Sequence, residues 1–370
     1  MSAAPQFHER AAHETGFAAF YLERIRPVFQ SLKAEEKKVR RAGLRSAAIV
    51  LLAGVLPVAG ALWLRSGPMG GAWWPAVMVG LVVLFIAGMV LAAASGTVED
   101  LVRKTVLPLL IDFRTQATDE SALRFVENPA KDFVDAKAFG NLRLFPDALF
   151  PNSFEATRGI EGTWKGVPYR MAHVLMQNEI HRASEPAKRK TLFSGGLLQV
   201  PLDTILAPSL ERPLPLTVFC ADREGLGPFG GLADLVKSRA EIAGTNVLPV
   251  PLADPELEKI YDVYSEDPDA LPEYFSSVIG RALTGIATDI LGVPRYLAAA
   301  VLDGRFYVAF PASDLPHRHE RGFLDLRAFG MSEGRFLEEL RAALEDLAVP
   351  EKVVSGLLDL RAGAAFGLRC

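Results

Sequence analysis

Residues 47–64 (AAIVLLAGVLPVAGALWL) and 72–94 (AWWPAVMVGLVVLFIAGMVLAAA) decide the fold, because they are two long runs in which the chain carries no charge. They contain 18 and 23 residues. As helices rising about 1.5 Å per residue, the second can cross a hydrocarbon core of roughly 30 Å, and the first just reaches across one. The intervening RSGPMGG at 65–71 is rich in turn-forming residues. The sequence therefore predicts a transmembrane helical hairpin over 47–94.

Two other interpretations of these runs fit less well. Helical pairs buried in a soluble core usually show apolar runs of about 10–14 residues. Trp63, Trp73 and Trp74 lie at the turn end of both runs, where the aromatic belt of a membrane protein belongs. A cleaved signal peptide would begin close to the N-terminus and would not be followed by a second apolar run. We therefore favour an integral membrane protein.

Basic residues before the first run set the expected orientation. The turn carries only Arg65, so the positive-inside rule places both termini in the cytoplasm. Residues 1–46 hold nine Lys or Arg and five Asp or Glu, a net charge of +4, which leaves −8 for the rest of the chain. The basic cluster before the first run consists of Lys37, Lys38, Arg40, Arg41 and Arg45. It is either a topology signal or a surface that attracts anionic lipid, and this attraction contributes about 1 kcal/mol per basic residue.

The composition of the two runs favours an anchor over a transporter. Neither contains an ionisable residue, and proton relays and ion pathways usually require one within the membrane. Small residues recur on one face of the second run, where they allow close helix packing within the hairpin or between two copies of the chain. These residues are Ala76, Gly80, Gly88 and Ala92.

Helices are expected on both sides of the hairpin. Residues 1–46 form an N-terminal amphipathic arm, in which Phe17, Phe20, Tyr21, Ile25, Val28 and Leu32 recur near helical spacing and Pro27 should kink or split the helix. Residues 97–136 form a juxtamembrane stalk that opens with a capping-box pattern at 97–100 and continues in a helix over 121–136. We expect the arm and the stalk helices to pair.

Residues 137–370 are predicted to form a cytoplasmic α+β domain on an antiparallel sheet. Tight-turn signals at Lys165-Gly166 and Asp303-Gly304 each join two strand-like runs, and hairpins of this kind favour antiparallel pairing. Asp254 and Asp267 each precede a proline, which is typical of a helix N-cap. Strands are expected over 160–164, 167–176, 191–202, 216–221, 296–302 and 305–311, with a bulge or close backbone approach at Gly195-Gly196, and helices over 272–288, 333–347 and 350–360.

Several segments also resemble a known family. In chain order they are VEDLVRKTVLPLLIDF (98–113), IEGTWKGVPYRMAHV (160–174), TLFSGGLLQVPL (191–202), LADPELEKIYDVYSEDPDAL (252–271) and LDGRFYVAFPASDL (302–315). With the preceding hairpin, this order is similar to the bacterial membrane-protein family catalogued as domain of unknown function 3137. The resemblance implies a multi-pass protein of the bacterial inner membrane. It supplies no catalytic residues, because the family has no assigned activity.

The sequence contains no nucleotide-binding, metalloprotease or serine-hydrolase motif. His317 and His319, with Asp314 and Glu320 nearby, could offer metal ligands, but a polar loop explains them as well. The glycine-rich 225–231 stretch is more typical of a loop than of a phosphate cradle. His173 and His181 fit ordinary strand positions, and Cys220 fits a buried small hydrophobe. We therefore predict no enzyme activity, no cofactor and no metal.

One acidic segment is the surface most suited to a partner. Its carboxylates are either helix caps on a solvated face or a docking surface for a basic protein. Nucleic acid is disfavoured, because the chain outside residues 1–46 has a net charge of −8. The seven residues are Asp254, Glu256, Glu258, Asp262, Glu266, Asp267 and Asp269.

Two functions follow as hypotheses. The favoured one is a membrane-anchored, non-enzymatic scaffold or adaptor whose cytoplasmic domain binds a protein partner. The alternative is a membrane-proximal sensor that binds a small molecule or a lipid head group. A hydrolase using His317, His319 or Cys220 is a distant third.

Overall fold

The chain forms two compact units in the computed structural model. They are a helical unit (1–113 and 326–341) and a sheet unit (114–325 and 342–370). The structure describes residues 6–65, 78, 82, 85, 101–117, 121–127, 129, 133, 136–142, 144, 153–182, 185–202, 204–205, 214–221, 247–252, 254–271, 275–291, 297–311, 324, 326–327 and 330–367.

The N-terminal arm becomes one nearly continuous helix. A 3₁₀ turn, η1 (Ala12–Glu14), precedes α1 (Phe17–Phe20), a π-helical turn η2 (Tyr21–Ile25) and the 40-residue α2 (Arg26–Arg65). Pro27 was predicted to kink or split the helix, and the split is wrong, because α2 runs through Pro27; a kink at this position stays a prediction. Proline lacks an N–H and its ring would clash with the carbonyl four residues earlier, and the wider π turn directly before it accommodates both effects.

The predicted apolar face of the arm is buried inside the helical unit. Phe17, Tyr21, Ile25 and Leu32 are at most 4% exposed, whereas Phe20 and Val28 are half-buried. Residues 101–117 are helical, and the ring of Phe113 lies 5.0 Å from that of Phe17 and 5.2 Å from that of Phe20. The arm therefore contacts the helix that follows the predicted hairpin.

The transmembrane hairpin has no support from the structure and stays a prediction. Among the described residues, no helix combines the length and the apolar character needed to cross a membrane. Apart from Met78, Val82 and Phe85, the 72–94 run lies outside the described residues, and so do the four predicted packing residues Ala76, Gly80, Gly88 and Ala92.

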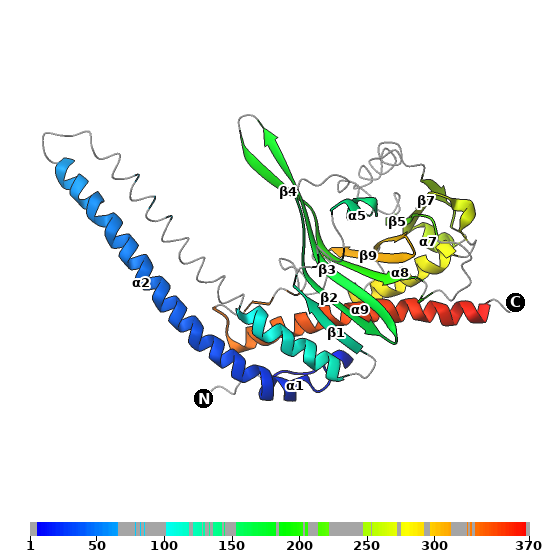
Figure 1. Ribbon diagram of the computed structural model, residues 1–370, viewed down its shortest axis with the longest axis horizontal. Coiled ribbons are helices and arrows are strands. Elements are labelled where there is room, and N and C mark those ends of the chain that lie inside the picture. The colour runs from blue at the N-terminus through cyan, green and yellow to red at the C-terminus, as the bar shows by residue number, and fades with distance from the viewer. Residues whose placement is uncertain are drawn as a thin grey trace. The chain divides into compact units, whose positions relative to one another are not determined.

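The sheet unit confirms the predicted α+β class with an antiparallel sheet. Nine strands pair in the order β1-β2-β3-β4-β9-β8-β5-β7-β6, and every pair described is antiparallel (Figure 1). The strands are β1 (Ser121–Val126), β2 (Ser153–Trp164), β3 (Val167–Arg182), β4 (Glu185–Pro201), β5 (Thr217–Ala221), β6 (Leu248–Val250), β7 (Tyr261–Ser265), β8 (Ala298–Leu302) and β9 (Arg305–Pro311).

Both predicted tight turns form. Lys165 and Gly166 have φ angles of 50° and 79°, and Asp303 and Gly304 have φ angles of 50° and 68°. Positive φ at both central residues is the signature of a type I′ turn, which matches the twist of the strands it joins. The turns fix the β2–β3 and β8–β9 registers, with Trp164 opposite Val167 and Leu302 opposite Arg305.

Two local predictions are wrong, and two strands were missed. Residues 121–126 form edge strand β1 rather than a helix, because they pair along their whole length with β2. Strands β6 and β7 were not predicted, and β7 lies inside the acidic segment. The two helices expected over 333–360 are one helix, α9 (Glu333–Gly367), which continues through Pro350. Burial of Val349, Val353 and Leu357 around that proline offsets its cost of about 3 kcal/mol.

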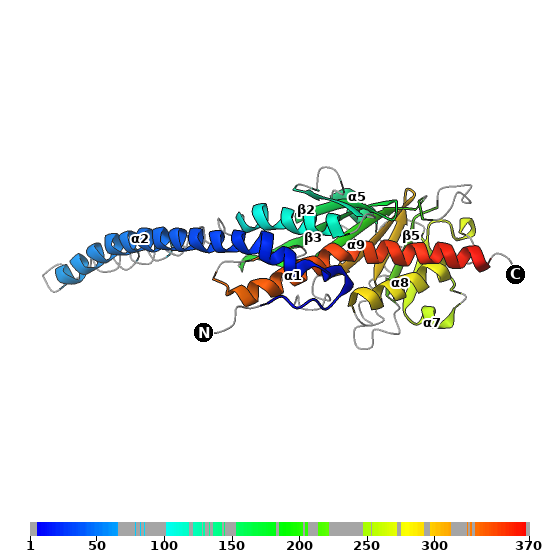
Figure 2. The same cartoon turned by 90° about the horizontal axis from the view of Figure 1, so that it is seen from below.

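Helices cover both faces of the sheet. The short α5 (Ala136–Asn141) lies on one face, while α8 (Phe275–Leu291) and the sheet-unit part of α9 lie on the other (Figures 1 and 2). Strand β9 shows the alternation, because Tyr307 and Ala309 belong to the apolar cluster around α5, whereas Phe306, Val308 and Phe310 do not. All five are at most 9% exposed, so the centre of the sheet is buried on both sides.

Candidate functional site

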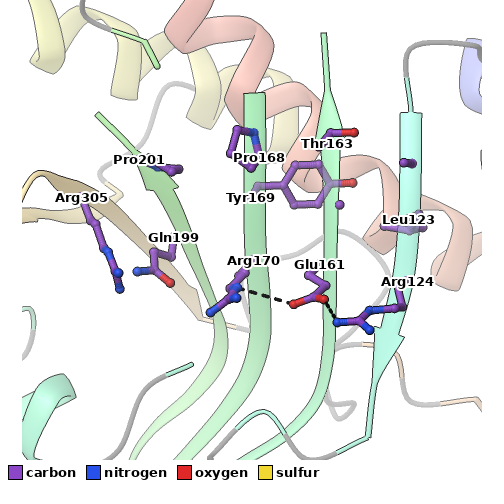
Figure 3. Close-up of a pocket in the computed structure, with 12 residues that line it drawn as sticks. Leu123, Arg124, Glu161, Thr163, Pro168, Tyr169, Arg170, Gln199, Pro201 and Arg305 are labelled. Atoms are coloured by element: carbon purple, nitrogen blue, oxygen red, sulfur yellow. Dashed lines mark hydrogen bonds and ion pairs between the residues drawn. The ribbon is translucent and has the colours of Figure 1, made fainter. Parts of the chain in front are cut away.

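The α5 face of the sheet carries an open groove of about 540 Å³ beside its apolar cluster (Figure 3). We call it the arginine groove. Its lining draws on five adjacent strands, and strand alternation points the polar side chains away from α8 and α9. The lining residues are Ala122, Leu123, Arg124, Glu161, Gly162, Thr163, Pro168, Tyr169, Arg170, Gln199, Pro201 and Arg305.

Strand register places the polar lining residues in one row. Arg124 lies opposite Glu161, Glu161 opposite Arg170, and Arg170 opposite Gln199. Gln199 in turn lies opposite Tyr307 on β9, two residues from Arg305. Because neighbouring strands lie about 4.8 Å apart, the row crosses the sheet with cationic and acceptor side chains in alternation.

Glu161 bridges two guanidinium groups. Its Oε1 pairs with Arg124 Nη2, and its Oε2 lies 3.5 Å from Arg170 Nε (Figure 3). The Glu161 side chain is 23% exposed, against 77% for Arg124 and 50% for Arg170. Both arginines therefore present much of their surface to the groove while their carboxylate partner is largely covered.

The other end of the row is built from Gln199, Arg305 and Tyr307. With its amide oriented to suit its neighbours, Gln199 Oε1 accepts from Arg305 Nη1 at 2.7 Å and from Tyr307 Oη at 3.3 Å. Gln199 is only 5% exposed, so Arg305 is held by a buried acceptor. Burial raises the pKa of the Tyr307 hydroxyl, which stays protonated as a donor.

A buried polar cluster lies on the opposite face of the same strands, and its member Tyr169 also borders the groove. Tyr169 is 2% exposed, and burial together with the nearby Glu351 carboxylate raises the pKa of its phenol. Burial also raises the pKa of Glu351, against the lowering effect of its partners Arg114 and Ser121. This cluster attaches α9 beneath the groove and fixes the strands that carry the row.

The groove is suited to binding an anion. Its lining holds three arginines and one glutamate, a formal charge of 3 − 1 = +2. Arginine guanidinium groups bind carboxylate and phosphate through paired N–H donors. The volume falls within the range of about 300–1,000 Å³ that is usual for small-molecule sites. In the described part of the chain, no group of three or more His, Cys, Asp or Glu could hold a metal ion.

The seven acidic residues lie outside the groove and on separate elements. Asp254 caps α7 (Pro255–Glu258) by accepting from Glu256 N at 3.1 Å, and it pairs with Arg281 at 3.3 Å. Asp267 caps the 3₁₀ turn η5 (Pro268–Ala270) by accepting from Ala270 N at 3.2 Å, while Asp262 lies on β7. Both predicted N-caps are therefore confirmed. Exposed carboxylates remain at Glu256, Glu258, Glu266, Asp267 and Asp269.

The other predicted candidates also lie away from the groove. Lys37, Lys38, Arg40, Arg41 and Arg45 are exposed on α2. Cys220 is partly buried and packs against the apolar cluster, and His173 is buried on β3. His181 is the penultimate residue of β3, whereas His317, His319, Asp314, Glu320 and the 225–231 stretch lie outside the described residues.

Reasoning from the sequence missed the groove. Its row combines residues from 124 to 307, and outward-facing polar side chains are ordinary where part of a sheet face is solvated. The pairing of β4 with β9, which brings Arg305 to Gln199, has no local signal in either strand.

Comparisons with protein-family models, curated proteins and solved structures find no match for this chain. The resemblance to domain of unknown function 3137 therefore stays a prediction.

Proposed function

We propose that this chain is a membrane-anchored, non-enzymatic sensor whose sheet unit binds a small anionic molecule in the arginine groove. The observation that carries the proposal is the row of three arginines, two of them paired with one carboxylate, in a groove of about 540 Å³. The presence of this groove is the reason to favour the sensor, which the sequence suggested as the alternative, over the scaffold or adaptor.

The anchor is the predicted hairpin over 47–94. Its support is the two charge-free runs and the exposure of Met78, Val82 and Phe85, which are 51%, 54% and 67% exposed at helical spacing. Carbonate washing of native bacterial membranes tests the anchor. We expect the full chain to stay in the pellet and a variant lacking 47–94 to be released. Release of the full chain would exclude an integral anchor.

The proposed ligand is tested by identifying the small molecules that co-purify with the chain. Full chain is purified from membranes as wild type, as Arg170→Gln and as Arg281→Gln, and extracted small molecules are identified by mass spectrometry. Arg281 is the matched control, because it is an exposed arginine paired with Asp254 outside the groove. We expect an anionic compound with wild type and R281Q and its depletion from R170Q. Equal recovery from all three variants would contradict the proposal.

The adaptor remains a second candidate because five carboxylates of the acidic segment are exposed. It predicts a basic protein partner that co-purifies with wild type and is lost when Glu256, Glu258 and Glu266 are changed to Gln. Loss of a partner in this variant, with groove binding unchanged, would favour the adaptor. Self-association through the second run is a separate prediction, tested by the mass of the purified complex.

A further inference from the structure

We infer that the arginine groove recognises a phosphate monoester, whose dianionic group takes the place of the Glu161 carboxylate between Arg124 and Arg170. This inference rests on the proposed sensor function and names the chemical class of its ligand.

The argument begins with how Glu161 is held. Each of its two carboxylate oxygens contacts a different guanidinium, one from β1 and one from β3. The contacts follow from register, because Arg124, Glu161 and Arg170 are direct cross-strand neighbours. The protein therefore holds its own anion where two arginines converge, and a stronger external anion can compete for the same donors.

Charge selects the kind of anion. The lining has a formal charge of +2, and Asp303 in the adjacent turn is not part of it. A phosphate monoester carries about −1.5 to −2 at pH 7 and offers three acceptor oxygens, whereas a carboxylate or a phosphodiester carries one charge. A monoester can thus bridge Arg124 and Arg170 as Glu161 does and neutralise the lining.

The rest of the groove accommodates the organic part of the phosphate ester. Arg305, fixed by Gln199 at 2.7 Å, stands two strands away from Arg170 and offers a second donor site. A tetrahedral phosphate fills only part of the volume. The ligand is therefore a phosphorylated organic molecule, either a lipid head group with a terminal phosphate or a soluble phosphate ester.

Calorimetric titration of the full chain in phosphatidylcholine nanodiscs with glycerol phosphate tests the inference. We expect Glu161→Gln to raise affinity about three- to tenfold, because it removes the competing carboxylate. We expect Arg170→Gln to lower affinity roughly ten- to hundredfold, since charge-assisted bonds are lost. R281Q should bind as wild type. Failure of E161Q to raise affinity would overturn displacement of Glu161.

The pH dependence of the affinity distinguishes a phosphate ligand from a carboxylate ligand. The affinity for glycerol phosphate should fall below about pH 6, where the monoester takes up its second proton, while fumarate, whose two carboxyl groups are stronger acids, keeps both charges there. Tighter binding of fumarate than of glycerol phosphate at pH 7 would overturn the phosphate assignment and leave the sensor proposal intact. Absence of binding by either anion, with a non-phosphorylated compound co-purifying, would also overturn it.

The lipid composition of the nanodisc distinguishes a lipid head group from a soluble phosphate ester as the ligand. Phosphatidic acid in the nanodisc should block glycerol phosphate binding if the head group reaches the groove, whereas phosphatidylglycerol, a diester, should not. Blocking by phosphatidic acid supports a lipid ligand. Unchanged binding supports a soluble phosphate ester.

Discussion

Arg114 and Glu351 form an ion pair inside the sheet unit, and their side chains are only 4% and 7% exposed. Arg114 lies in the helix that follows the predicted hairpin, and Glu351 lies on α9 and also accepts from Ser121 at 3.5 Å. The pair thus joins that helix, α9 and the edge strand β1 of the sheet that carries the groove.

Breaking this pair on one side should be costly. We expect Arg114→Met to lower the free energy of unfolding by about 3–5 kcal/mol, because Glu351 is left buried without its cation. The double variant Arg114→Met, Glu351→Met should recover much of the loss. Urea denaturation followed by tryptophan fluorescence measures both variants. A cost below about 1 kcal/mol for R114M would show that the pair is not buried in solution.

Glu351 should also make stability depend on pH. Its folded-state pKa is raised by burial, so the folded state binds its proton more tightly than the unfolded state does. The stabilisation linked to that proton is complete below the unfolded pKa and is lost as pH rises through the folded pKa. Compared with Glu351→Gln, wild type should therefore lose stability from about pH 4 upward. A difference in the free energy of unfolding between wild type and E351Q that stays the same at every pH would contradict a raised pKa.

Gly195 permits a close approach between β4 and β9. A Cβ there would lie 2.1 Å from the carbonyl oxygen of Phe310, so the predicted close backbone approach is confirmed. We expect Gly195→Ala to destabilise the chain by about 1–3 kcal/mol. Gly285 is the control, because it is exposed on α8 and a Cβ added to it would meet no other atom within 4 Å. Gly285→Ala should stabilise by about 0.5–1 kcal/mol in the same thermal melts.

Arg341 holds the N-terminal segment of the helical unit. It contacts Glu14 at 2.9 Å and the His8 carbonyl at 2.7 Å, and its guanidinium lies 4.6 Å from the centre of the Phe7 ring. Arg341→Lys cannot reproduce this planar set of contacts. We expect residues 6–20 to exchange amide hydrogens roughly ten times faster, from a loss of about 1.4 kcal/mol. Arg335→Lys, an exposed position on α9, should leave exchange unchanged.

Local chemistry predicted the hairpins and caps but not the pairing of distant strands. The φ preferences of Asp303-Gly304 and Lys165-Gly166 determine the type of turn that each pair forms. The short side chains of Asp254 and Asp267, each followed by proline, are typical of helix N-caps. The segment SALRFV at 121–126 fits helix or strand, and only β2 decides it. The groove depends on registers among five strands, so no single stretch of sequence encodes it.

The pairing of β4 with β9 also sets an order of assembly. Gly196 lies opposite Phe310, so this contact closes a loop of 310 − 196 = 114 residues, whereas β2, β3 and β4 follow one another along the chain. Local hairpins form early, and pairing over such a separation is slow. A growing polypeptide holds Arg124, Glu161, Arg170 and Gln199 once residue 201 is made, but Arg305 arrives only about a hundred residues later. The arginine groove is thus complete only after β9 has been synthesised, and a chain terminated before residue 305 would lack the third arginine of its lining.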